Sequence, residues 1–421
     1  MRCRSPRSTV SLIAGSLALA TALCAQGQRK QAGPDPYTGG DSALLDRLGY
    51  VSLGPFEIGS GHDSTAVEEL LGTEPLAWIE TAHFRMGCSL SPLALRGQQD
   101  WSKEWIRSVR DELDELRALL PKGRIKKRVK SLDPWLRAHL MARRLEQLYA
   151  EVCGLLGRDD AWFAAGHNNP LRPDDFSGIG PYLGMQQKPV VLMLQKRGGL
   201  ARYTRQYRGG ETNESIRHHD LAFGSMFWGC SQESANNLFQ SDYALHASLA
   251  FNVAHNLYTS YRCFGHDLPP WLVTGLAHWH ARRVSPRFPN YDREDPRDRR
   301  DRSPFWDWDA RVAGLVKNDV FEPLEKLVAV ASAGRFGIEQ HMQSWAVVDY
   351  LVAEQPTQLA RFLHELKAPF HGRLRMPSQD ELQRRQRESF DAAFGADVAA
   401  IDGAWRAAVR GQKRKRKRSR R

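Results

Sequence analysis

Residues 245–283 read LHASLAFNVAHNLYTSYRCFGHDLPPWLVTGLAHWHARR, and this stretch decides the predicted fold. It predicts one helix that carries FNVAH at 251–255, then a loop, and then a second helix that opens with PPWLVTGLA at 269–277. At 100° per residue, Phe251, Asn252 and His255 share one face of the first helix. The segment therefore predicts two neighbouring helices that together carry a candidate site.

This stretch resembles the peptidase MA-like (gluzincin) family. That family holds zinc with a His-Glu-x-x-His helix and with a glutamate in a Pro-Trp-Leu-x-Glu-Gly-Leu-Ala segment on the next helix. The resemblance places Phe251 at the first zinc-binding histidine and Asn252 at the catalytic glutamate. His255 matches the second histidine, and Thr274 stands at the third ligand. His278 stands where the family often has an acidic residue that supports a zinc-bound histidine.

Three of these residues lack the chemistry that a zinc peptidase needs. Catalytic zinc takes three protein ligands from His, Asp, Glu or Cys, and the ring of Phe251 has no lone pair to donate. The amide of Asn252 cannot take a proton from a zinc-bound water, and Thr274 offers a neutral alcohol in place of a carboxylate. We therefore expect no catalytic residue, no bound zinc and no other cofactor at this site.

A rewired zinc site is the alternative. His255 and His278 would then be two of the metal ligands, and a third ligand would come from elsewhere in the chain, because two imidazoles are too few for a firm site. On this alternative the chain is a divergent zinc metallopeptidase. Without metal, His255 is expected to be a neutral, half-buried histidine with hydrogen-bonded nitrogens.

The resemblance extends over residues 76–410 through weaker motifs. Residues 78–86 and 189–194 resemble two strands of the family fold, and residues 343–351 resemble the helix that packs behind the site. Phe394-Gly395 and Trp405 resemble the closing helix. The implied fold class is α+β, with a small N-terminal mixed sheet packed on a mainly helical C-terminal half.

Other segments complete the predicted organisation. Residues 26–75 contain many Gly, Asp and Ser residues and are expected to form a partly ordered leader. From Trp105 to Leu120, apolar residues recur every three or four positions, which predicts a helical insertion at about 95–134 beside a helix at 135–156. Residues 286–304 are crowded with Asp, Arg and Pro and predict an exposed loop.

The N-terminal residues predict export. An apolar run from Val10 to Leu23 follows three arginines, which is the pattern of a secretory signal peptide. Cleavage near Ala25 would make residues 1–25 the signal, and Cys24 leaves lipoprotein processing as an alternative. No later stretch is long and apolar enough to predict a transmembrane segment. The protein is therefore expected to be secreted or to reside in the periplasm or cell envelope.

Four of the six cysteines lie beyond the predicted signal, at positions 88, 153, 230 and 263. In an oxidising compartment they allow three disulfide pairings, and sequence does not choose among them. We favour Cys88 with Cys153, and Cys230 with Cys263 because that bond would tie a hairpin region to the loop between the two site helices. Buried free thiols are the alternative.

The formal net charge of +12 is concentrated at the two ends of the chain. The predicted signal carries three arginines, and eight of the nine residues from Lys413 to Arg421 are basic, so the body between them is nearly neutral. This tail has no apolar residue and is expected to be disordered from 411 to 421. Behind a signal peptide, an anionic envelope surface is the expected partner, and no specific nucleic acid is expected.

The run His218-His219-Asp220 offers side chains for a second metal site, but a solvated turn before a strand at 221–228 explains it more simply. The sequence thus predicts an exported peptidase-like protein without peptidase activity. Its cleft is expected to bind peptides or envelope proteins.

Overall fold

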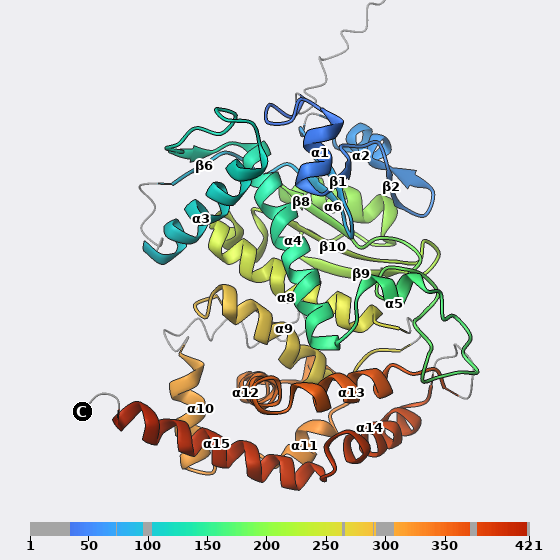
Figure 1. Cartoon of the computed structure of the whole chain (residues 1–421), viewed down its shortest axis with the longest axis vertical. Helices are drawn as coiled ribbons and strands as arrows, with labels where there is room; N and C mark the ends of the chain where they lie inside the picture. The colour runs from blue at the N-terminus through green and yellow to red at the C-terminus, as the bar shows by residue number, and fades with distance from the viewer. Residues whose placement is uncertain are drawn as a thin grey trace, which may run out of the picture.

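The computed structural model describes residues 34–72, 74–95, 103–262, 266–288, 290–291, 307–370 and 377–418. It is an α+β structure with a mixed six-stranded sheet in its N-terminal half and a mainly helical C-terminal half (Figure 1). The predicted fold class is confirmed at this level.

Across the main sheet, the strands lie side by side in the order β1 (Tyr50–Ser52), β4 (Ala77–Thr81), β5 (Arg85–Cys88), β8 (Val190–Leu194), β10 (Ser225–Ser231) and β9 (Ile216–Asp220). Strands β5, β8 and β10 are parallel, and the other neighbours are antiparallel. Every residue of β4, β8 and β10 is buried, as expected for central strands that are covered on both faces.

Two hydrophobic cores lie on the two faces of the sheet. On one face, Leu192 of β8 packs with residues of α2 (Ser64–Leu71) and α6 (Arg197–Tyr207). On the other face, Met193 belongs to a larger core that includes α4 (Pro134–Leu156) and α8 (Asp242–Ser260). Because successive side chains of a strand point to opposite faces, one strand contributes to both cores.

The region expected to be a partly ordered leader is part of the fold from residue 34 onward. It contains α1 (Ser42–Leu48), β1, the hairpin of β2 (Glu57–Gly59) and β3 (His62–Asp63), and α2. Strand β1 pairs with β4, so the main sheet begins within this region. The polar composition that suggested a leader has a local function, since Asp41 and Asp63 cap the N-termini of α1 and α2.

The helix expected within about 95–134 is α3 (Lys103–Leu119), which buries Trp105, Val109, Leu113 and Leu116. A short pair of strands, β6 (Leu93–Ala94) and β7 (Ser131–Leu132), joins the chain before α3 to the chain after it. Helix α4 then begins at Pro134 with Asp133 as its N-cap. The sequence periodicity from Trp105 to Leu120 therefore located α3.

The remaining helices are mostly in the C-terminal half: α5 (Asp160–Ala164), α7 (Ser234–Asn237), η1 (Leu238–Gln240), α9 (Pro270–Val284), α10 (Trp308–Lys317), α11 (Leu324–Val328), η2 (Ala333–Arg335), α12 (Ile338–Glu354), α13 (Pro356–Leu366), α14 (Gln379–Phe394) and α15 (Val398–Arg418). Helices α10 to α15 lie at the end of the molecule opposite α1 and α2 (Figure 1). None of the described helices is long and apolar enough to cross a membrane.

The structure differs from the prediction in the C-terminal tail. Helix α15 continues to Arg418, where disorder was expected from residue 411. Lysine and arginine are good helix formers, so a helix that is already nucleated by its packed first part can extend through them.

The cysteine thiols also differ from the favoured pairing. Cys88, Cys153 and Cys230 are free in the structure, so the bond between Cys88 and Cys153 is not formed. Cys88 lies on β5 and Cys153 on α4, and burial raises the pKa of both thiols. Cys263 lies outside the described residues, as do the predicted signal peptide and most of the loop at 286–304.

Candidate functional site

The two predicted site helices are α8 and α9, and α9 begins at the Pro-Pro segment that the sequence indicated. Ser241 caps α8 by accepting a hydrogen bond from the backbone of Ala244, and Pro270 occupies the first turn of α9. Asn256 donates a hydrogen bond of 3.1 Å to the carbonyl of Phe227 and thereby fixes α8 against β10. The site is therefore built on two helices beside the edge of the sheet that ends in β9.

Gly275 explains how closely α9 approaches the helix behind it. A Cβ atom at this position would lie 2.5 Å from the carbonyl oxygen of Ser344 and 2.6 Å from a methyl group of Val348, both on α12. Glycine is therefore needed at this position for packing, independently of any chemistry at Thr274 next to it.

Phe251 is a packing residue. Its side chain is fully buried in a cluster with Ala277 and Ala281 of α9. Its ring centroid lies 4.8 Å from that of His278. The position that the family resemblance assigns to the first zinc-binding histidine is thus filled by a ring that joins α8 to α9.

Asn252 belongs to a hydrogen-bond network. Its side-chain oxygen accepts a 2.8 Å bond from Arg217 on β9, and its amide donates a 2.8 Å bond to the carbonyl of Ser248. Arg217 pairs in register with Trp228 of β10, whose side chain lies in the core beside α8, so Arg217 is on the face of the sheet that α8 covers. The amide that the resemblance places at the catalytic glutamate therefore joins α8 to the edge strand.

His255 and His278 lie in different surroundings. His255 is half-buried, and its Nδ1 lies 3.5 Å from the hydroxyl of Thr259 one turn later on α8. His278 is fully buried, and its Nε2 forms a 3.1 Å hydrogen bond with Nδ1 of His341 on α12. Thr274 is also fully buried, and its hydroxyl has no hydrogen-bond partner among the described residues.

Aromatic rings surround the His278–His341 pair. The two imidazoles meet edge to face at 90°, with ring centroids 5.2 Å apart. Trp308 of α10 lies 4.9 Å from the ring of His278, and Phe336 lies 5.6 Å from that of His341. This aromatic cluster ties α9, α10 and α12 together.

The two histidines of β9 face opposite sides of the sheet. His218 pairs with Phe227 on the α6 side, whereas His219 pairs with Met226 on the α8 side. Burial lowers the pKa of His219 and outweighs the charge of Asp267, which would raise it. Burial and the positive charge of Arg208 both lower the pKa of His218. The sequence was wrong to place residues 218–220 in a solvated turn, because they form the second half of a strand.

The residues present do not fit a zinc ion at the position that the family resemblance suggests. Phe251 provides no donor atom, Asn252 is engaged with Arg217 and Ser248, and Thr274 is a buried alcohol. In the part of the chain that the structure describes, no group of three His, Cys, Asp or Glu side chains is arranged to hold a metal ion. The site residues that the sequence missed are Arg217 and His341, which come from distant elements.

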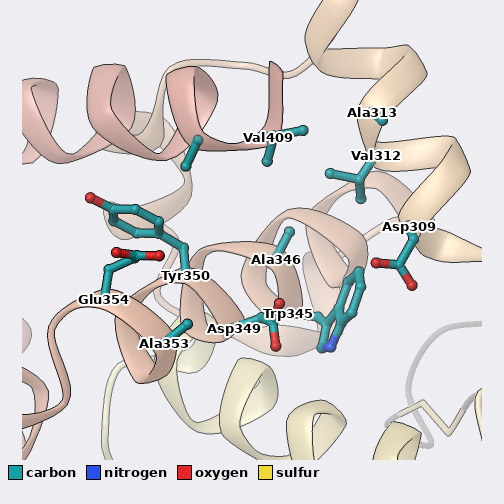
Figure 2. A pocket seen from close by; sticks show the side chains of 11 residues that line it. Asp309, Val312, Ala313, Trp345, Ala346, Asp349, Tyr350, Ala353, Glu354 and Val409 are labelled. Carbon is teal, nitrogen blue, oxygen red and sulfur yellow. The ribbon is translucent and has the colours of Figure 1, made fainter. Parts of the chain in front are cut away.

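A surface hollow lies away from these residues, between α10, α12 and α15 (Figure 2). Asp309 of α10 and Asp349 of α12 line it together with Trp345 and Val409. Burial and the nearby charge of Asp309 raise the pKa of Asp349. None of the candidate site residues Phe251, Asn252, His255, Thr274 and His278 lines this hollow.

Comparison of the sequence with protein-family models and with curated proteins finds no match.

Proposed function

We propose that this chain is an exported peptidase-like protein of the gluzincin type that binds peptides or envelope proteins without hydrolysing them. The observation that carries the proposal is the packing of Phe251 against His278, Ala277 and Ala281. The resemblance assigns position 251 to a metal ligand, but the Phe251 side chain there makes a packing contact between α8 and α9. Asn252 supports the same conclusion, because both polar ends of its amide are engaged.

Strand β9 offers the binding surface. It is the last strand of the main sheet, and among the described strands it pairs only with β10. An extended peptide can add to such an edge through backbone hydrogen bonds, with side chains of the edge strand selecting among peptides. Arg217 is suited to that selection, since it lies on β9 and its guanidinium also contacts α8.

The test uses tryptic peptides of casein as unstructured probes. The chain from Gln26 onward is incubated with them, cleavage is followed by mass spectrometry, and retention is measured by equilibrium dialysis. We expect saturable retention and no cleavage, with weaker retention for Arg217→Ala than for wild type. The control is Arg205→Ala, which removes a surface arginine that pairs with Glu211.

Two results would overturn the proposal. Cleavage that a chelator abolishes would favour the divergent zinc metallopeptidase that uses His255 and His278. Absence of retention for every peptide would remove the peptide-binding function. Equal retention by the two arginine variants would leave peptide binding intact but would place it away from β9.

A further inference from the structure

The loop between α3 and β7 is strongly basic. Residues 122–130 read KGRIKKRVK, so six of nine residues carry a positive charge. All six of these side chains are exposed, at Lys122, Arg124, Lys126, Lys127, Arg128 and Lys130. We call residues 122–130 the basic loop.

The basic loop is held in place by the body of the protein. Ile125 is 5% exposed and belongs to the main core, as does Leu120 just before the loop. The backbone N–H of Leu95 donates a 2.9 Å hydrogen bond to the carbonyl of Lys130, next to the pairing of β6 with β7. The positive charges are therefore presented on an ordered surface.

Three acidic side chains of the segments that flank the loop are engaged elsewhere. On α3, Asp114 pairs with Arg117, and Glu112 pairs with Arg144 of α4. Asp133, just after the loop, accepts a hydrogen bond from the hydroxyl of Tyr37 and caps α4. Within the described ranges, none of the six basic side chains of the loop forms an ion pair.

The basic loop lies where the chain enters the fold from its N-terminal segment. Arg124 donates a 3.4 Å hydrogen bond to the carbonyl of Pro36, and Asp35 is fixed by a 3.2 Å contact with Nε2 of His139 on α4. This end of the molecule also carries α1 and β6 (Figure 1). The apolar run at 10–23, which is predicted to enter a membrane during export, precedes this point by about a dozen residues.

We propose that the basic loop binds the anionic headgroups of a lipid bilayer and orients this end of the molecule towards a membrane. Lysine and arginine form charge-assisted hydrogen bonds with phosphate, and clustered basic residues are attracted to the negative potential of anionic lipid. The loop exposes no large apolar side chain, so binding is electrostatic and weakens as salt screens it. This inference does not depend on the proposed peptide binding.

The test measures sedimentation of the chain from Gln26 onward with phosphatidylglycerol–phosphatidylcholine vesicles and with pure phosphatidylcholine vesicles. The loop variant combines Lys126→Ser, Lys127→Ser and Arg128→Ser. Each removed charge is expected to lower partitioning into the anionic vesicles roughly fivefold, so the triple variant should lose about a hundredfold at low salt. The experiment is repeated in a chain that ends before Lys413, so that the basic tail does not mask the effect.

The matched control removes the same charge from other faces of the molecule. It combines Arg172→Ser, Lys317→Ser and Arg387→Ser, three exposed positions on other segments of the chain. We expect the control to change partitioning by less than about threefold, because only distant, screened charges are lost. Both triple variants should keep the thermal unfolding midpoint of the wild type.

The proposal is overturned if the two triple variants lose binding equally, because net charge alone would then explain it. It is also overturned if the loop variant binds anionic vesicles as well as wild type does. A third contrary result is tight binding of a duplex oligonucleotide by the loop with no binding of anionic vesicles, which would make the partner a nucleic acid.

Discussion

Replacing Phe251 by alanine tests whether this position is a packing site. The side chain is fully buried, and its apolar neighbours include Ala277 and Ala281, whose short side chains cannot fill the space that the ring would leave. The ring contact with His278 would also be lost. Truncation of a buried phenylalanine to alanine costs about 3–5 kcal/mol of unfolding free energy. We expect about 4 kcal/mol here, because the neighbouring alanines cannot close the cavity.

Urea unfolding followed by tryptophan fluorescence measures this cost. Phe251→Leu should cost only about 1.5 kcal/mol, because most of the apolar volume is kept. Leu238→Ala is the control, since that side chain is 39% exposed, and it should change stability by less than about 0.5 kcal/mol. A cost below about 1 kcal/mol for Phe251→Ala would refute the packing argument, because the ring would then contribute little to holding α8 against α9.

Two further predictions concern packing and pH. Gly275→Ala should destabilise the protein by about 2 kcal/mol in urea unfolding, because the added methyl group forces α9 away from α12. The control Gly314→Ala lies on α10 with open space around it and should be neutral or stabilising. Equal effects of the two substitutions would contradict the close approach of α9 to α12. Burial alone would lower the pKa of His83, but Glu146 and Asp160, 2.6 and 2.9 Å from its ring nitrogens, outweigh burial and raise it. The stabilisation by protonated His83 is therefore complete below its unfolded pKa of about 6.5 and is lost as the pH rises through the higher folded value. In urea unfolding, the free energy of unfolding of wild type should exceed that of His83→Gln by about 1 kcal/mol at pH 6 and by less at pH 9. A stability difference that grows with pH would contradict this sign.

Local sequence signals were enough to locate α8 and α9. Pro270 marks the start of α9 by backbone chemistry that acts over a few residues, and the segment at 251–255 was predicted to lie on the helix that is α8. The α+β class was implied by the family resemblance, and the structure agrees with it in having a mixed sheet in the N-terminal half and a mainly helical C-terminal half.

The contacts within the candidate site were not predictable in the same way. Asn252 meets Arg217 across 35 residues of chain, and His278 meets His341 across 63, so both contacts depend on how the sheet and helices pack. The polar edge strand β9 was missed because its residues are all half-buried and give no clear alternation of apolar and polar side chains.

Zinc content tests the central claim most directly. The chain from Gln26 onward, purified without chelator and dialysed against micromolar zinc, is analysed by elemental mass spectrometry beside a variant that combines Phe251→His, Asn252→Glu and Thr274→Glu. That variant is the positive control, because it restores two histidines with His255, a carboxylate ligand and a general base. We predict far less than one zinc per wild-type chain and a clear gain in the variant. Near-stoichiometric zinc in the wild type that disappears on His255→Ala would contradict the account.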